Sequence, residues 1–155
     1  MSAASNYLEK KLLDSALGIT SFTQTAGNIR IALFTGTAAT VLANLENSVF
    51  TNEVSTTGTG YARVSLNTSG STNTSGWTAA TEPTSTDTAG YYEVSNTNAI
   101  TFSEALLDWG TITCVAVVDN TASKVLFYGA VTVEKTIQAG DTFQISAGQL
   151  KIRLS

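Results

Sequence analysis

Histidine is absent from this chain of 155 residues, and cysteine and proline each occur once. Histidine is the usual general base near neutral pH and a frequent metal ligand, so its absence excludes most routes of nucleophilic catalysis and most transition-metal sites. The single cysteine, Cys114, cannot form a disulfide within the chain. Its apolar neighbours in TITCVAVVD predict a buried side chain rather than a reactive thiol, because burial raises the pKa of a thiol.

Charged side chains are also scarce, at 13% of the chain, against a usual share of about 25%. The formal net charge is −4, and no Lys or Arg lies between Arg63 and Lys124. Because nucleic acids are bound through clustered cations, we expect no nucleic-acid partner. Few charges combined with many threonines favour strands over exposed helices, which usually carry Lys and Glu on their surfaces.

Long apolar stretches are missing as well. No apolar run of the sequence approaches the roughly 18 residues of a membrane-spanning helix. The N-terminal segment contains Glu9, Lys10 and Lys11 where a secretory signal would be apolar. We therefore expect no membrane partner, and synthesis and folding in a cytoplasm. The length predicts one domain, residues 1–155, that folds without disulfides.

Acidic residues offer the remaining route to catalysis, because a pair of carboxylates can hydrolyse glycosides. The candidate pairs are Glu104 with Asp108 and Asp119 with Asp141, and all lie in turn segments where acids usually accept hydrogen bonds from backbone amides. Neither a Gly-rich phosphate-binding loop nor the D-x-D-x-D spacing of a calcium loop is present. We expect no enzymatic activity, no metal site and no cofactor.

The N-terminal residues show helical periodicity. Asn6 and Glu9 have the spacing of a capping box, and Gly18 is placed to end a helix. Apolar side chains recur between them at helical intervals, at Leu8, Leu12, Leu13, Ala16 and Leu17. The pattern predicts a short α-helix within an N-terminal arm, residues 1–18. This arm either covers an end or edge of a sheet or docks on a partner or sister subunit, because so short a helix is unstable alone.

Short strands separated by turn residues dominate the rest of the chain. Thr111–Val118 is apolar on both faces and is therefore predicted to be the central strand. Alternation predicts that Tyr61 points outward and that Ile152 and Leu154 face the core, and the segment 41–45 indicates a helical turn. Further strands are predicted at 28–35, 61–66, 91–94, 99–103, 124–133, 142–146 and 149–155. These signals predict an all-β fold with one N-terminal helix, an antiparallel sandwich or barrel of about 8 strands.

Residues 67–90 are rich in Thr, Ser, Gly and Asn and predict a long loop of the kind that often carries function. Trp77 in this loop has two possible roles. It fills the core beneath the loop, or it is an exposed contact residue at an interface.

Structural motifs follow one another from Ala99 onward: AITFSEA, WGTI, AVVDN, LFYGAV and AGDTFQISAGQLKIRL. Together with NYLEKKLLDSALG, IRIALFT and GYARVSL, they resemble small structural proteins of tailed bacteriophages, labelled as tail fibre proteins or known as head-decoration proteins. The resemblance implies a virion protein without catalytic residues. It implies a capsid decoration (cement) protein on the capsid surface, a homotrimer that binds the major capsid protein lattice and stabilises the head.

An alternative is a tail fibre or tail-tip protein that recognises host surface glycan. In that role Trp77, Tyr91 and Tyr92 would stack on sugar rings. For either role, the candidate interface residues are Tyr7, Leu8, Leu12, Leu13, Trp77, Tyr91 and Tyr92.

Overall fold

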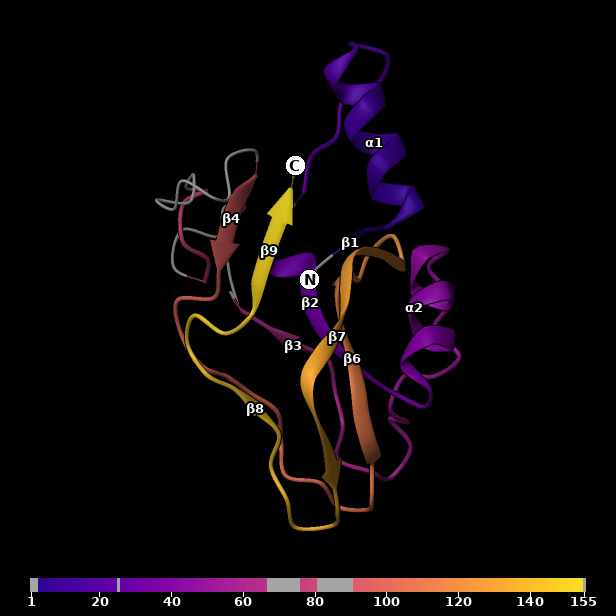
Figure 1. Cartoon of the computed structure of the whole chain (residues 1–155), viewed down its shortest axis with the longest axis vertical. Coiled ribbons are helices and arrows are strands. Elements are labelled where there is room, and N and C mark those ends of the chain that lie inside the picture. The colour runs from indigo at the N-terminus through magenta and orange to yellow at the C-terminus, as the bar shows by residue number, and fades with distance from the viewer. Residues whose placement is uncertain (1–2, 25, 67–75, 81–90, 155) are drawn as a thin grey trace.

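A five-stranded antiparallel sheet forms the centre of the molecule in Figure 1, a computed structural model that describes residues 3–24, 26–66, 76–80 and 91–154. The strand order is β1-β7-β6-β2-β3, and every neighbouring pair is antiparallel. In chain order these strands are β1 (Ala3–Ala4), β2 (Ile29–Thr35), β3 (Val64–Ser65), β6 (Gly110–Asp119) and β7 (Lys124–Ile137).

Two short antiparallel ladders cover one face of this sheet. They pair β4 (Tyr92–Ser95) with β9 (Lys151–Leu154), and β5 (Ile100–Thr101) with β8 (Gln144–Ile145). Among the described residues, the sheet has two edge strands, β1 and β3, and is not closed into a barrel. This architecture confirms the predicted all-β antiparallel fold.

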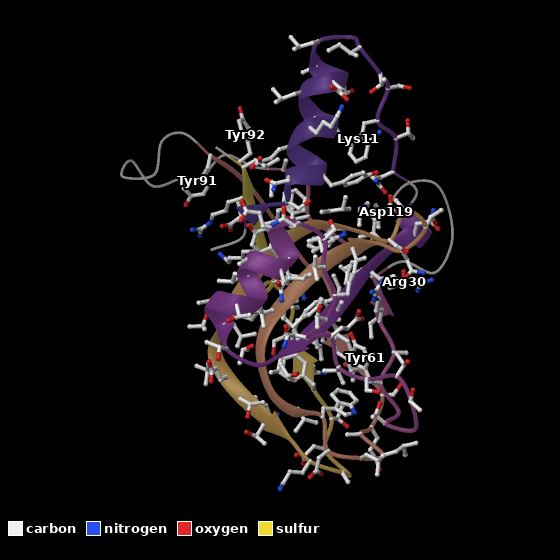
Figure 2. The ribbon with its side chains drawn as sticks, turned by 90° about the vertical axis from the view of Figure 1, so that its right-hand side faces the viewer. Lys11, Arg30, Tyr61, Tyr91, Tyr92 and Asp119 are labelled. Atoms are coloured by element: carbon white, nitrogen blue, oxygen red, sulfur yellow. The ribbon has the colours of Figure 1, made fainter. Side chains whose placement is uncertain are left out.

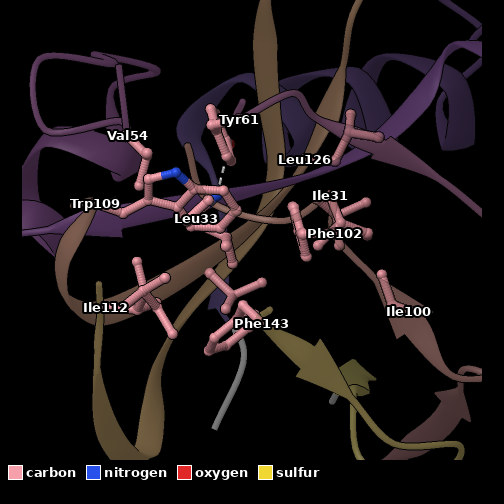
Figure 3. Close-up of a cluster of buried hydrophobic side chains, with 14 of the residues drawn as sticks. Ile31, Leu33, Val54, Tyr61, Ile100, Phe102, Trp109, Ile112, Leu126 and Phe143 are labelled. Carbon is pink, nitrogen blue, oxygen red and sulfur yellow. Dashed lines mark hydrogen bonds between the residues drawn. The ribbon is translucent and has the colours of Figure 1, made fainter. Parts of the chain in front are cut away.

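The larger hydrophobic core fills the space between the sheet and the ladders, as Figure 3 shows. Ile31 and Leu33 of β2 are both 0% exposed in this core. The ring of Phe102 is stacked on Tyr61, with ring centroids 6.0 Å apart, and meets Phe143 edge-on at 5.9 Å. Side chains from strands and loops far apart in the sequence therefore hold the two layers together.

A second, smaller core lies on the opposite face of the sheet, beneath α2 (Ala38–Glu46). Val41 and Leu45 of this helix are both 0% exposed, and so is Cys114 below them. Burial raises the pKa of the Cys114 thiol, as the sequence predicts. The helix itself is a difference from prediction, because 41–45 indicated only a helical turn. Its outward face carries few charges, which weakens the amphipathic signal.

The central position predicted for Thr111–Val118 is confirmed. β6 lies between β2 and β7, and all of its residues from Ile112 to Asp119 are buried. Val115 and Val117 belong to the larger core, whereas Ala116 and Val118 belong to the core beneath α2. This alternation explains why the strand is apolar on both faces.

Tyr61 does not point outward as predicted. Its side chain is 3% exposed, and its hydroxyl accepts a hydrogen bond from the Leu33 N–H (2.9 Å) and donates one to Glu53 (3.1 Å). Regular pairing in this segment is limited to β3, so Tyr61 precedes the strand and is free of its alternation. Gly60 makes the turn before it, with φ of +76°.

Candidate functional site

The N-terminal helix α1 (Asn6–Ala16) is anchored to the sheet at its first turn. The Ser5 side-chain oxygen accepts a hydrogen bond from the Leu8 N–H at 3.3 Å, and its hydroxyl donates to the Val125 carbonyl. Immediately before it, β1 pairs with β7. The N-cap is therefore Ser5, whereas the expected capping box placed it at Asn6. Ser5 takes this position because its hydroxyl and the preceding β1 are bound to β7.

The far half of α1 projects beyond the strands (Figure 1 and Figure 2) and presents leucines to solvent. Leu12, Leu13 and Leu17 are 38%, 62% and 72% exposed, and Ile19, just after the helix, is 66% exposed. At 3.6 residues per turn, these leucines lie on one side of the helix. We call this surface the α1 face: Leu12, Leu13, Ala16 and Leu17.

The side of α1 that packs on the protein carries both apolar and charged side chains. Leu8 is the one buried member of the predicted leucine stripe, and Tyr7 packs edge-on against Phe22 with ring centroids 6.5 Å apart. Asp14, also on this side, forms a 2.5 Å ion pair with Lys10. A surface helix usually turns its apolar stripe to the core and its charges to water. The far half of α1 departs from this arrangement, because Leu13 and Leu17 face solvent while the Asp14 side chain is 16% exposed. This suits a helix that another protein surface covers.

More apolar surface lies at the same end of the molecule, where β4 begins and β9 ends (Figure 1). Tyr92 and Leu154 are opposite each other in the β4–β9 register and are 60% and 44% exposed. The prediction that Leu154 faces the core is wrong, because β9 continues past the buried Ile152 to the end of the core.

Charged groups flank this strand pair. The Glu93 carboxylate lies 2.6 Å from the Arg153 guanidinium and 3.0 Å from the Lys151 ammonium, and both cations lower the pKa of Glu93. The Arg153 guanidinium also lies 4.8 Å from the ring centroid of Tyr91. One ring face of Tyr91 is therefore covered, which leaves Tyr92 as the more exposed aromatic side chain here.

Trp77 is half-buried and packs against the larger core. Its backbone forms a β-bridge with Asn96. This position agrees with the core-filling role, one of the two roles considered for it. The rest of the predicted loop, 67–75 and 81–90, lies outside the described residues.

The predicted interface residues thus lie in different environments. Leu12, Leu13 and Tyr92 are exposed, whereas Leu8 belongs to the core. Tyr7, Tyr91 and Trp77 are half-buried. The sequence did not predict that Ile19 is an exposed apolar residue next to the α1 face. No helical periodicity marks Ile19, because it follows the end of the helix.

Three of the four acidic residues considered for catalysis, Asp108, Asp119 and Asp141, accept hydrogen bonds from backbone amides, as predicted. The N–H donors are Ala139 to Asp108 (2.8 Å), Thr121 to Asp119 (3.0 Å) and Gln138 to Asp141 (2.9 Å). Among the described residues, no group of His, Cys, Asp or Glu could hold a metal ion. Within the same part of the chain, no helix is long and apolar enough to span a bilayer.

Comparison with known proteins identifies one family. Its sequence model, described as podophage GP4 fiber I protein gp80, matches residues 3–153. No curated protein matches the chain. The match confirms the expected class, a phage structural protein, and its description names a fibre without referring to capsid decoration. Matched over nearly its whole length, the chain belongs to this family of phage fibre proteins and has a structural role in a virion.

Proposed function

We propose that this protein is a subunit of a fibre on a phage virion and that it assembles there through the α1 face. The family description supports the fibre. The orientation of α1 supports the attachment surface, because Leu13 and Leu17 are more than half exposed while the Asp14 side chain is only 16% exposed. Exposed apolar patches of this kind mark protein–protein contacts.

The rest of the molecule suits a structural subunit. Its sheet is covered on one face by the ladders and on the other by α2, so the β body holds α1 on a rigid support. We expect no catalytic activity, since Asp108, Asp119 and Asp141 accept hydrogen bonds from backbone amides. Fibre assembly requires only complementary surfaces, without a cofactor.

The experiment that tests this function is the localisation and quantification of the protein in purified virions. Cryo-electron microscopy with a tagged chain should place it in a fibre, at a few copies relative to the major capsid protein. Absence of the chain from infectious particles would contradict a virion role altogether.

A capsid decoration protein is the second candidate, and the compactness of the fold favours it. The described residues form one β body with one projecting helix, without an elongated shaft (Figure 1). A body of this shape could sit on the major capsid protein lattice, with α1 contacting the lattice. Copy number separates the two candidates, because decoration requires a number of copies comparable to that of the major capsid protein.

If the protein is a fibre subunit, it could also recognise host glycan. Tyr92 offers an exposed ring beside the charged side chains of Glu93 and Arg153, and aromatic rings of this kind can stack on sugars. If this surface binds glycan, Tyr92→Ala should reduce adsorption of the phage to host cells while leaving the amount of protein in the virion unchanged. Loss of the protein from the virion would instead assign Tyr92 to assembly.

A further inference from the structure

An open hollow of about 700 Å³ lies beside β3, an edge strand of the sheet. Three separate parts of the chain meet there with β2: the segment that follows α2, the residues just before β3 and the turn after β6. The polar side chains that line it are Arg30, Glu53, Ser55, Thr56, Arg63 and Asn120. We call this surface the Arg30 hollow.

Arg30, labelled in Figure 2, brings an uncompensated positive charge to this hollow. Its side chain is half-buried, yet its guanidinium has no hydrogen-bond or ion-pair partner within the part of the chain that the structure describes. Its neighbours on the adjacent strands, Ser65 of β3 and Val118 of β6, are not acidic. A guanidinium carries five N–H donors, so a half-buried one has a strong requirement for acceptors.

Glu53, the acidic residue that lines the hollow, does not compensate this charge. Its two carboxylate oxygens accept hydrogen bonds from Nε and Nη2 of Arg63, at 2.7 and 2.6 Å. The Tyr61 hydroxyl donates to it as well, at 3.1 Å. Glu53 and Arg63 therefore neutralise each other, and the lining keeps the single positive charge of Arg30. This balance suits a ligand group with one negative charge, such as a carboxylate.

Two further donors line the hollow. The Asn120 side-chain oxygen accepts a hydrogen bond from Nη1 of Arg63 at 3.1 Å, which leaves its NH₂ group as a donor. Neither this NH₂ group nor the Thr56 hydroxyl has a partner among the described residues. An ionised carboxylate offers only acceptors, and it pairs with an arginine through two parallel hydrogen bonds. The set of donors thus favours a carboxylate over a neutral or cationic group.

The remaining lining favours a sugar over a peptide as the carrier of this carboxylate. Among the described residues, none of the exposed large apolar side chains lies in the hollow, and Val54 in its wall is only 4% exposed. Peptide and protein partners usually bind through apolar or aromatic anchors, which need apolar surface of this kind. The hydroxyls of Ser55 and Thr56 are instead suited to hydrogen bonds with the hydroxyls of a sugar.

We propose that the Arg30 hollow binds an acidic sugar, with Arg30 paired to the sugar carboxylate and with Thr56 and Asn120 donating further hydrogen bonds. The inference goes beyond the proposed function, because it assigns a ligand to a surface that assembly through the α1 face does not use. The site is also separate from Tyr92, since no residue of β4 or β9 lines the hollow.

Titration of the ¹⁵N-labelled full-length chain with glucuronate, followed by NMR, tests the inference. The Nε–H signal of Arg30 and the side-chain NH₂ signals of Asn120 should shift and reach saturation. Glucose, which lacks the carboxylate, should leave them in place. Acetylated glutamate amide, which carries a carboxylate on a peptide unit, should bind more weakly than glucuronate. Shifts that do not saturate, equal shifts with glucose, or equal affinity for the two acids would overturn the inference.

Variants test the role of the charge in the same titration. Arg30→Gln should weaken glucuronate binding about tenfold or more, because a hydrogen-bonded ion pair is lost. The matched control is Lys135→Gln, which makes the same change of net charge at an exposed side chain of β7 and should bind as the wild type does. Wild-type affinity in Arg30→Gln, or an equal loss in Lys135→Gln, would contradict the proposed site.

Thr56→Val gives a second variant that leaves the arginine in place. It removes the hydroxyl and keeps the shape of the side chain, so glucuronate should bind several times more weakly while acetylated glutamate amide is little affected. The NMR spectrum of each variant also reports whether it is folded. An unchanged affinity of Thr56→Val for glucuronate would overturn the assignment of sugar contacts to Thr56.

These results can be separated from those on the virion role. A chain that is found in fibres but does not bind glucuronate would overturn the acidic-sugar site and leave the fibre function intact. A chain that binds glucuronate through Arg30 but is absent from particles would overturn the fibre function alone.

Discussion

At the scale of single residues, Tyr61 shows how a long-range contact can override a local pattern. Alternation places it outside, yet its ring lies between Phe102 and Trp109, at centroid distances of 6.0 and 5.4 Å. Its hydroxyl satisfies the Leu33 N–H of β2. That amide belongs to a strand 28 positions earlier in the sequence, so no pattern around Tyr61 could indicate the contact.

Tyr61→Phe should lower the free energy of unfolding by about 1–3 kcal/mol, because the buried Leu33 N–H loses its acceptor. Urea denaturation measures this change. Tyr92→Phe is the matched control, since that ring is 60% exposed, and it should shift the free energy by less than about 0.5 kcal/mol. Similar losses in the two variants would contradict a structural role for the Tyr61 hydroxyl.

The ionisation of Tyr61 predicts a pH dependence. Burial, and next the charge of Glu53, raise the pKa of Tyr61 above its ordinary value of 10.0. Its contribution to stability is complete below the unfolded-state pKa and is lost as the pH rises above about 10, because there only the unfolded state releases the proton. Tyr61→Phe should therefore lose less stability than the wild type above that pH. Parallel curves of unfolding free energy against pH would show that Tyr61 contributes nothing to the loss.

Gly60 is required at its position for steric as well as conformational reasons. A Cβ there would lie 2.6 Å from the Glu104 carbonyl oxygen, whereas Gly18, with a similar positive φ, has open space around it. Gly18→Ala should cost about 1–2 kcal/mol from its left-handed backbone alone. Gly60→Ala should cost more, as measured by thermal unfolding. Equal costs would mean that the contact at Gly60 relaxes freely.

At the scale of elements, the sequence predicted best the strands that pack against other elements on both faces of the sheet. The middle of β2 and most of β6 are buried, because α2 covers one face of the sheet and the ladders cover the other. The leucine periodicity also predicted the helix α1. Periodicity shows that a helix has an apolar face, but it does not show what covers that face. The outward direction of the α1 face follows from the anchoring of Ser5 to β7, a contact between residues 120 positions apart.

Leu45→Ala tests the role of α2 as a cover for the sheet. Leu45 is 0% exposed in the core beneath this helix. The substitution should lower the free energy of unfolding by about 2–5 kcal/mol through lost burial and a cavity. Leu107→Ala, at a side chain 55% exposed, should change it by less than about 0.5 kcal/mol. A small effect at Leu45 in urea denaturation would mean that α2 is not part of the cooperative fold.

At the scale of the whole molecule, the protein is a sheet covered on both faces that holds one helix with its apolar face turned outward. The family match indicates a fibre, and the α1 face supplies a surface through which a fibre subunit could assemble. The sequence predicted the β fold and the phage class. Which part of the N-terminal arm remains uncovered became visible only from the packing of α1 on the sheet.

The most direct test of this account is the amount of the protein in purified virions that carry Leu13→Lys with Leu17→Lys, measured by mass spectrometry against the major capsid protein. The account predicts that this variant is folded in the cell lysate but is lost from the particles. Virions with Leu106→Lys and Leu107→Lys should keep the wild-type amount. If the Leu13/Leu17 variant is present in virions at the wild-type level, assembly through the α1 face is contradicted.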